Sequence, residues 1–464
     1  MDDLVVLSPH GAAAQAVGGG AVVTGAGRAA VTGAVASLLG SVPAGLPAVA
    51  VTGTSTAAAL PPGQVVVADE VCGPGIAHRL PAATLLAEEL RRDGVDVVVG
   101  PVTTEGGPGL ATDDDSAWAL AALPAGTPVA VVRAVEGPGA LAALGRLRPA
   151  LEHWARAVGD RRLVLAAPRS FCAGVERAIE IVERAIDRFG APVYVRRQIV
   201  HNAHVVADLA GRGAVFVQEL DEVPDGATVV LAAHGVTPAV RAQAGERDLQ
   251  VVDATCPLVA KVHHEARRFA AHGYEIALIG HGDHEEVEGT LGEAPMHLVE
   301  SVADVEGLAV PGGKPVAYLT QTTLATDETA EIVGALRRRY PGLVGPSSDD
   351  ICYATQNRQD AVRAMAGQCD LVLVVGSANS SNTARLVEVA RREGARAELV
   401  EDARQLRLDW LDGAGTVGLT AGASVPEVLV QEVIDALGRL GRLDVDEHRT
   451  TEESVRFALP LQVR

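Results

Sequence analysis

The sequence predicts an α/β protein built from several small parallel sheets that are wrapped by helices. Short, continuous apolar runs recur along the chain, which is typical of parallel strands buried on both faces. Segments whose apolar residues have helical spacing separate most of these runs. Cysteines, histidines and hydroxyl-bearing residues follow many of the runs, at the edge where open α/β sheets bind their ligands.

Composition narrows the class of protein further. The chain has 464 residues, 48% of them apolar, which allows two to four domains with large cores. A net charge of −20 argues against binding to a nucleic-acid backbone. Five cysteines over this length do not make a disulfide scaffold. With neither a signal-peptide pattern nor a long uninterrupted apolar run, we expect a cytoplasmic protein without a membrane span.

Residues 1–158 are expected to form a separate small α/β domain. Val-rich runs such as Val65–Ala68 and Val95–Val99 alternate there with Ala/Leu-rich helical stretches. A helix at Leu147–Val158 closes this part, and Gly159–Arg162 forms a short linker. Residues 159–464 then form the second domain.

In the second domain the α/β rhythm restarts with a strand at Leu163–Ala167 and a helix at Gly174–Phe189. Further strands are expected at Val193–Val195, Ala214–Val217, Thr228–Ala232, Gln250–Val252, Glu275–Ile279, Val316–Leu319, Leu371–Val375 and Gly415–Leu419. Further helices are expected at Val259–His272, Ala330–Arg339, Arg358–Met365, Thr383–Glu393 and Val425–Leu437. The end of the chain is charged and then extended, and its Phe457–Leu461 run is expected to dock on the body.

Three cysteines each precede a predicted helix: Cys172, Cys256 and Cys352. Backbone N–H groups and the helix dipole favour the thiolate at such a place. Their wide spacing excludes a zinc-finger pair and suits three α/β units that each bring one cysteine to a shared centre. Three thiolates could hold zinc together with a histidine, or an iron–sulfur cluster in which one iron lacks a protein ligand. The residues alone leave both possibilities open.

Histidines and neutral hydrogen-bond donors also follow the predicted strands. His201, His234 and His284 occupy such positions, and hydroxyl and amide side chains open two later helices. These are Ser380, Ser381, Asn382 and Ser424. Any one of them could be an ordinary helix cap, but together they are typical of a phosphate site at helix N-termini.

Residues from about 161 to 464 resemble the family of 4-hydroxy-3-methylbut-2-enyl diphosphate reductases. The resemblance lies in Pro168–Val175, Ile199–Asn202, Ala233–Val236, Asp253–Val259, His284–Thr290, Thr320–Leu324, Asp350–Gln359, Asn379–Asn382 and Thr420–Ser424. It implies a three-lobed α/β fold with pseudo-threefold symmetry around a central 4Fe–4S cluster. Cys172, Cys256 and Cys352 match the family's cluster ligands, which leaves one iron open.

The resemblance also implies roles for the other candidate residues. His201, His234, His284, Ser380, Ser381, Asn382 and Ser424 match the diphosphate pocket. Glu286 matches the acid of the proton relay, and Thr322 matches the residue on the path to the substrate hydroxyl. The implied reaction removes that hydroxyl reductively and yields isopentenyl and dimethylallyl diphosphate in the non-mevalonate pathway, with electrons from ferredoxin or flavodoxin. The alternative is a non-catalytic, cluster-bearing diphosphate sensor, which would need neither Glu286 nor Thr322.

The N-terminal part resembles, more weakly, the purine nucleoside phosphorylase/nucleosidase superfamily. The resemblance lies in Ala21–Arg28, Val95–Thr104 and Asp113–Trp118. Family members usually carry Met-Glu where this chain has Asp114-Asp115. We therefore expect a degenerate domain, and the alternative is a bifunctional protein with an active nucleosidase.

Overall fold

The computed structural model of the chain describes residues 4–8, 11–17, 21–23, 28–41, 48–57, 59–73, 76–104, 110–113, 116–310 and 313–464. The chain divides into two compact units. Unit 1 comprises Met1–Leu163, Asp402–Val417 and Gln431–Val445, and unit 2 comprises Val164–Glu401, Gly418–Val430 and Asp446–Arg464. Two segments near the C-terminus thus cluster with the N-terminal residues, whereas the sequence alone predicted a division at residue 158.

The N-terminal residues form a mixed sheet in the order β2-β1-β3-β8-β4-β6-β7, with β5 beside β4. Its strands are β1 Leu4–Ser8, β2 Ala21–Val23, β3 Ala48–Ser55, β4 Val65–Gly73, β5 Ile76–Arg79, β6 Val97–Thr104, β7 Ala111–Asp113 and β8 Val129–Val135. The helices are α1 Gly11–Val17, α2 Arg28–Ser41, α3 Ala83–Arg92, α4 Ser116–Ala122, α5 Ala140–Leu144 and α6 Arg148–Ala157. Strand β4 runs antiparallel to β5 and β8, and valines dominate the buried core.

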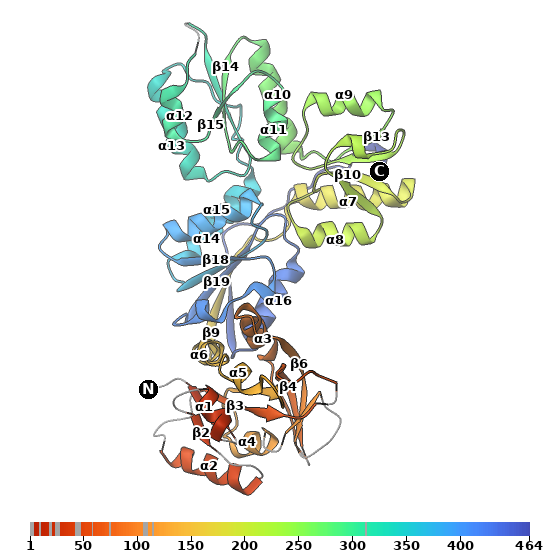
Figure 1. The fold of residues 1–464 in the computed structure, drawn as a ribbon. Helices are drawn as coiled ribbons and strands as arrows, with labels where there is room; N and C mark the ends of the chain where they lie inside the picture. Colours follow the sequence, from red (N-terminus) through yellow and green to blue (C-terminus); the bar gives the residue numbers. More distant parts are fainter. Residues whose placement is uncertain are drawn as a thin grey trace. The chain divides into compact units, whose positions relative to one another are not determined.

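Three further sheets have helices beside them (Figure 1). The first, in the order β11-β10-β12-β13, is parallel throughout. Its strands are β10 Val193–Arg196, β11 Ala214–Val217, β12 Thr228–Leu231 and β13 Gln250–Asp253. Its helices are α7 Ala173–Phe189, α8 Ala203–Gly211 and α9 Pro238–Glu246, with a 3-10 turn at Leu220–Glu222.

The second sheet, in the order β15-β14-β16, is also parallel. It contains β14 Glu275–Ile279, β15 His297–Val299 and β16 Val316–Thr320, with helices α10 Pro257–Ala271, α11 Glu285–Leu291, α12 Val302–Gly307 and α13 Thr326–Arg339. The third has the order β18-β17-β19-β9-β20. It contains β9 Arg161–Ala167, β17 Leu371–Val375, β18 Arg396–Val400, β19 Thr416–Ala421 and β20 Leu443–Arg449, with α14 Tyr353–Ala366, α15 Ser381–Arg392 and α16 Glu427–Gly438. Short 3-10 turns lie at Ala403–Gln405, Leu408–Leu411 and Leu461–Val463.

Two helices begin four or five residues earlier than their apolar periodicity predicts. Helix α14 starts at Tyr353 instead of Arg358, and α13 starts at Thr326 instead of Ala330. The first turns of both helices are polar, so the apolar period becomes visible only further along. Helix α14 therefore begins immediately after Cys352, whose sulfur accepts the N–H of Thr355 at 3.4 Å.

The end of the chain docks as expected. Residues 450–460 have no regular secondary structure, and Leu459 and Val463 pack with Ile181 and Val182 of α7. Figure 1 shows the C-terminus near this helix. The α/β class, with three lobes after a separate N-terminal sheet, is confirmed. None of the described helices is long and apolar enough to cross a membrane.

Candidate active site

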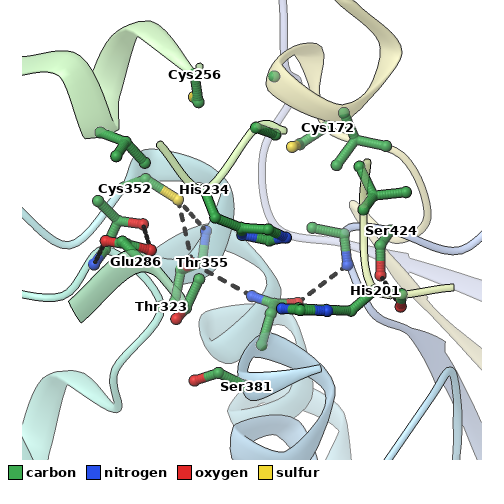
Figure 2. A pocket seen from close by; sticks show the side chains of 18 of the residues that line it. Cys172, His201, His234, Cys256, Glu286, Thr323, Cys352, Thr355, Ser381 and Ser424 are labelled. Atoms are coloured by element: carbon green, nitrogen blue, oxygen red, sulfur yellow. Dashed lines mark hydrogen bonds between the residues drawn. The ribbon is translucent and has the colours of Figure 1, made fainter. Parts of the chain in front are cut away.

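All the site residues predicted from the sequence line one cavity of about 100 Å³ in unit 2. Figure 2 shows the thiols of Cys172, Cys256 and Cys352 around this cavity, with His201 and Ser381 below them in that view. The cavity is also lined by Gly174, Val175, Val200, Ala233, Leu258, Val259, Thr323, Thr355 and Ala423. The structure thus brings the predicted residues together, and their individual roles stay predictions.

Each of the three cysteines is the N-cap residue of a helix. Cys172 precedes α7, Cys256 precedes α10 and Cys352 precedes α14. The backbone N–H of each cysteine donates a hydrogen bond to a carbonyl in a neighbouring loop of the cavity. The acceptors are Ala423 at 3.2 Å, Ala233 at 2.9 Å and Thr322 at 3.0 Å, in the same order. The same local device therefore holds all three thiols beside the rest of the pocket.

Burial, and not the helix N-terminus, decides the protonation of two of these thiols. It raises the pKa of Cys256 to about 12 and that of Cys352 to about 11, although backbone N–H groups at both sites lower it. Cys172 adds to the increase at both sites, and Cys352 adds to it at Cys256, because neighbouring thiolates repel one another. At these two sites the helix N-termini therefore act in the expected direction, but burial outweighs them in the protein without a bound cation. A bound metal would reverse this preference, because coordination deprotonates a thiol.

Gly174 leaves room for the sulfur atoms. A Cβ at this position would lie 2.9 Å from Cys256 Sγ and 3.8 Å from Cys172 Sγ. The first distance is too short for a real contact, so any side chain here would displace that sulfur. The two thiols therefore converge on a space that glycine keeps open, which fits a group bound between them.

A chain of hydrogen bonds joins Cys352 to the opposite part of the pocket. Its Sγ lies 3.1 Å from the hydroxyl of Thr355, which accepts a bond from Asn382 Nδ2 at 3.2 Å. The side-chain oxygen of Asn382 accepts the N–H of Ala423 at 3.0 Å. Next to Ala423, the Ser424 hydroxyl donates to the carbonyl of His201 at 3.1 Å. The amide of Asn382 thus fixes the spacing between a thiol and the predicted diphosphate residues.

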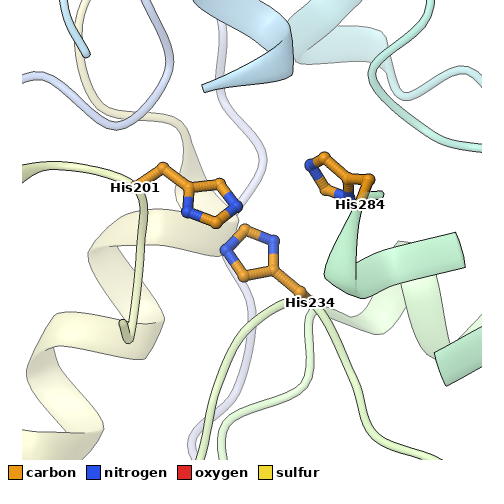
Figure 3. A group of neighbouring side chains, drawn as sticks. All are labelled: His201, His234 and His284. Carbon is orange, nitrogen blue, oxygen red and sulfur yellow. The ribbon is translucent and has the colours of Figure 1, made fainter. Parts of the chain in front are cut away.

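The three histidines form a compact group (Figure 3). The rings of His201 and His234 stack with centroids 4.2 Å apart, and the ring of His284 meets them edge-on at 5.4 and 5.6 Å. One ring nitrogen from each lies within 4.8 Å of the others, as metal ligation would require. The Nε2 atoms of His201 and His234 are buried and have no partner among the described residues. The same atoms could donate to the oxygens of an anion.

Burial lowers the pKa of all three rings. It brings the pKa of His201 and of His284 to about 4, and that of His234 well below its ordinary value. Repulsion between the rings lowers the last two further. Near neutral pH the rings are therefore uncharged, and a bound anion would raise their pKa by favouring the protonated form.

Glu286 is the buried carboxyl group of the cavity. Its oxygens accept the N–H of Thr322 at 2.6 Å and the Thr322 hydroxyl at 3.0 Å. Burial raises its pKa to about 7, although both bonds lower it, and the charge of Asp350 adds to the increase. Helix α11 places Glu286 in its first turn, where the Glu286 N–H donates to Nδ1 of His284 at 3.1 Å. A carboxyl group with a pKa near 7 is suited to general acid catalysis.

The predicted site residues did not include Gly174, Thr355, Gln321 and Thr323, although Gln321 and Thr323 stand in a run of polar donors after a predicted strand. The Gln321 amide donates to the hydroxyls of Thr323 and Ser381, at 2.9 and 3.4 Å. Its carbonyl oxygen accepts the N–H of His281 at 3.1 Å. Thr355 could have been found from its place three residues after the helix-capping Cys352. The role of Gly174 depends on contacts across the fold and has no local signal.

The histidines predict how stability depends on pH. Below about pH 6.5 the unfolded chain binds protons at these rings, whereas folded His201 resists protonation down to about pH 4. The free energy of unfolding contributed by this ring therefore falls as pH drops through that window, by about 1.4 kcal/mol at pH 5.5. Urea unfolding of wild type and His201→Asn, compared at pH 7.5 and 5.5, measures the difference. An equal pH dependence in both proteins would contradict the assignment of a neutral buried ring.

Known proteins resemble a large part of this chain. The LytB protein family matches residues 163–438. The 4-hydroxy-3-methylbut-2-enyl diphosphate reductase of Cutibacterium acnes is 60% identical over 308 residues, which is 66% of this chain and 95% of that protein. 4-Hydroxy-3-methylbut-2-enyl diphosphate reductase 1 of Mycobacterium tuberculosis is 59% identical over 314 residues, with the same two shares.

Solved structures agree with these sequence matches. The E-1-hydroxy-2-methyl-but-2-enyl-4-diphosphate reductase from Plasmodium falciparum is 39% identical, with a TM-score of 0.64, over 66% of this chain and 97% of that one. Nucleosidases, the class that the N-terminal part was expected to resemble, are also matched. S-adenosylhomocysteine nucleosidase from Streptococcus pyogenes is 17% identical, with a TM-score of 0.28, over 32% of this chain and 94% of that one, a likeness that assigns no chemistry. The reductase matches carry the assignment, and the chain belongs to the LytB family of 4-hydroxy-3-methylbut-2-enyl diphosphate reductases.

Proposed function

We propose that this protein is an iron–sulfur enzyme that reduces 4-hydroxy-3-methylbut-2-enyl diphosphate to isopentenyl and dimethylallyl diphosphate. One observation carries the proposal: three thiols, three neutral histidines and a carboxyl group with a pKa near 7 line a single cavity. The family relationship supports the reaction. Balance requires two electrons and two protons, since a C–O bond breaks, a C–H bond forms and water leaves. An external one-electron donor of the ferredoxin or flavodoxin kind would supply the electrons.

The residues present fit a 4Fe–4S cluster. Cys172, Cys256 and Cys352 would each ligate one iron, and Gly174 leaves the space between two of the sulfurs open. The other two cysteines lie outside this cavity, so a fourth thiol ligand is lacking among its lining residues. A cluster held by three cysteines supplies an iron that can act as a Lewis acid and a path for electrons.

The substrate diphosphate would bind between the histidines and the start of α15. His201, His234 and His284 offer ring nitrogens, and Ser380, Ser381 and Asn382 lie at a helix N-terminus, where backbone N–H groups favour anions. Uncharged rings cost less to bury than imidazolium ions, and they can take up protons as the anion enters. Binding and orientation in this pocket would hold the substrate hydroxyl toward the thiol side.

Glu286 would hold the proton that the leaving hydroxyl needs. Its two bonds to Thr322 fix the carboxyl group against the loop whose carbonyl oxygen accepts the N–H of Cys352. The Thr322 hydroxyl could pass a proton on, because a hydroxyl both donates and accepts. A sensor that only binds a diphosphate has no use for a carboxyl group poised in this way, which supports an enzyme over a sensor.

The N-terminal part is proposed to be catalytically degenerate. Asp114 and Asp115 lie outside the described residues, but Asp113 is described and buried. Its carboxylate pairs with Arg133 Nε at 2.8 Å and accepts the Thr104 hydroxyl at 2.7 Å. Burial raises the pKa of Asp113, but the charge of Arg133 and bonds from Ser116 and Thr104 lower it below its ordinary value. This carboxylate is thus engaged in holding strands together, and no observation favours an active nucleosidase.

Anaerobically purified protein should contain about four irons per chain. Replacing Cys172, Cys256 or Cys352 with Ser should remove most of this iron, because each replacement deletes a ligand. Cys369→Ser is the matched control, since this thiol lies outside the cavity and bonds to the carbonyl of Met365. Iron analysis and optical spectra check the prediction. One zinc per chain and no iron would contradict it.

Gly174→Ala should release iron while leaving all three ligands in place. The new methyl group would lie 2.9 Å from Cys256 Sγ and push that sulfur away from its position. The loss should be about 10- to 100-fold in cluster retention against a chelator, as for other changes beside metal ligands. Gly211→Ala is the control, because a Cβ there meets no atom within 4 Å. Equal retention in both variants would show that the space beside Gly174 is not needed.

Glu286→Gln should bind substrate normally but turn over roughly 10² times more slowly or worse, the usual size of a general acid contribution. Wild-type turnover should fall as pH rises through about 7, where Glu286 loses its proton, and the variant should lose this dependence. Glu288→Gln in the same helix is the control, because Glu288 is exposed and pairs with Arg197. Rates from pH 6 to 9 test both points, and an unchanged profile in Glu286→Gln would exclude the role.

A further inference from the structure

Helix α7, which begins after Cys172, carries a cation that reaches the loop before the second cysteine. Arg177 Nη1 donates to the carbonyls of Ala254 and Thr255, at 3.2 and 3.1 Å. Thr255 directly precedes Cys256. Burial lowers the pKa of Arg177 below its ordinary value, and the charges of Cys256 and Asp253 oppose this effect in part. Helix α7, which follows Cys172, thus hydrogen-bonds the backbone that leads into Cys256.

Helix α10, which begins after Cys256, repeats this contact toward the third cysteine. Lys261 Nζ donates to the carbonyls of Ser348 and Asp349, at 2.5 and 3.0 Å, and to Asp350 Oδ1 at 3.1 Å. These residues end one position short of Ile351, which precedes Cys352. Asp350 also accepts the N–H of Thr320, at the end of β16. The second link therefore joins α10 to the loop that leads into α14.

Helix α14, which begins after Cys352, completes the cycle back to the first cysteine. Arg358 has no exposed side-chain surface. Its Nη2 donates to the carbonyls of Ser170 and Phe171, at 2.7 and 3.2 Å, and its Nε donates to Ser170 at 3.2 Å. Phe171 directly precedes Cys172. The three links therefore run from each helix to the next cysteine loop and form a closed ring.

The end of the chain supports two members of this ring. Glu453 pairs with Arg358 at 3.0 Å and accepts a bond from Asn357 at 3.0 Å. The carbonyl of Ala458 accepts Arg177 Nε at 2.9 Å. Each arginine thus uses some of its N–H groups for a cysteine loop and others for the C-terminal residues.

We propose that Arg177, Lys261 and Arg358 form a cation ring that positions the three cysteine loops for a shared metal group. Each is a positioning residue, since it holds main-chain carbonyls and is not among the residues that line the cavity. The cations stand five or six residues after their cysteines, on the turn of each helix that faces the neighbouring loop. The ring rests on the proposed function for the identity of the metal group, but its contacts are present without that group.

Two physical effects follow from the ring. A carbonyl that is hydrogen-bonded to a cation cannot rotate freely, so the backbone that leads into each cysteine is held in place. The positive charge of Arg177 also interacts with Cys256, where it favours the thiolate over the thiol. Because each link ties a different pair of elements, loss of one link should loosen one particular loop before the others.

Hydrogen exchange on the metal-free full-length chain tests the positioning directly. Arg177→Gln should increase exchange around 254–256, Lys261→Gln around 348–352 and Arg358→Gln around 169–172. The same helices offer matched controls: Arg184→Gln, Arg267→Gln and Arg363→Gln, whose side chains pair with carboxylates elsewhere. Increases in all three loops alike, or increases no larger than in the controls, would overturn the proposal.

Chelator challenge of the anaerobic holoprotein gives the second readout. Each ring variant should lose iron about 10- to 100-fold faster than its control, as expected for residues that support metal ligands. Arg177→Lys and Arg358→Lys keep the charge but lose the separate Nε and Nη donors that bond the cysteine loop and the C-terminal residues at once, so they should restore retention only in part. Full rescue by lysine would overturn the positioning role. If the wild-type protein contained no iron, the proposed cofactor would be refuted. The hydrogen-exchange experiment would then test the cation ring by itself.

Discussion

Exclusion of water from one small cavity sets the protonation of the groups inside it. The same burial acts in opposite directions on different chemistry: it lowers the pKa of His201, raises that of Cys352 and raises that of Glu286 to about 7. In each case the uncharged form gains, because an ion is costly to bury. In the metal-free protein His201 and Cys352 are therefore uncharged near neutral pH, whereas Glu286 is close to half protonated. A bound cation would then favour thiolates at the cysteines, and a bound diphosphate would favour protonated histidines.

Repetition of one local device explains how three separate lobes build that cavity. In each lobe a cysteine caps a helix, its N–H donates to the carbonyl of a pocket loop, and a cation five or six residues later holds the next cysteine loop. None of these contacts needs precise packing between large surfaces, because main-chain carbonyls and helix ends have fixed geometry. The pseudo-threefold arrangement follows from using the device three times around a closed cycle.

The sequence predicted the cavity residues better than the contacts that support them. Cys172, His234 and Glu286 stand beside strand or helix ends, and that position, together with the family resemblance, carries their signal. Arg177 and Arg358 look like ordinary charged residues of amphipathic helices in the sequence. Their partners are backbone carbonyls, which every residue has, so the side-chain pattern could not predict these contacts. Residues 402–417 and 431–445 likewise belong to the same compact unit as the N-terminal part. No local sequence pattern indicates this long-range grouping.

Neutral thiols also constrain how a metal group can enter. With the pKa of Cys256 and Cys352 above neutral pH, metal binding must release protons, so the affinity of the site rises with pH. Glu286, a buried carboxyl group of the same cavity, has a pKa of about 7, and its charge opposes that of Cys352 as a thiolate. A protonated Glu286 therefore favours a thiolate ligand at Cys352, and a proton leaving Glu286 weakens it. Proton supply and ligand charge are thus coupled across Thr322, whose hydroxyl binds the acid and whose carbonyl holds the cysteine.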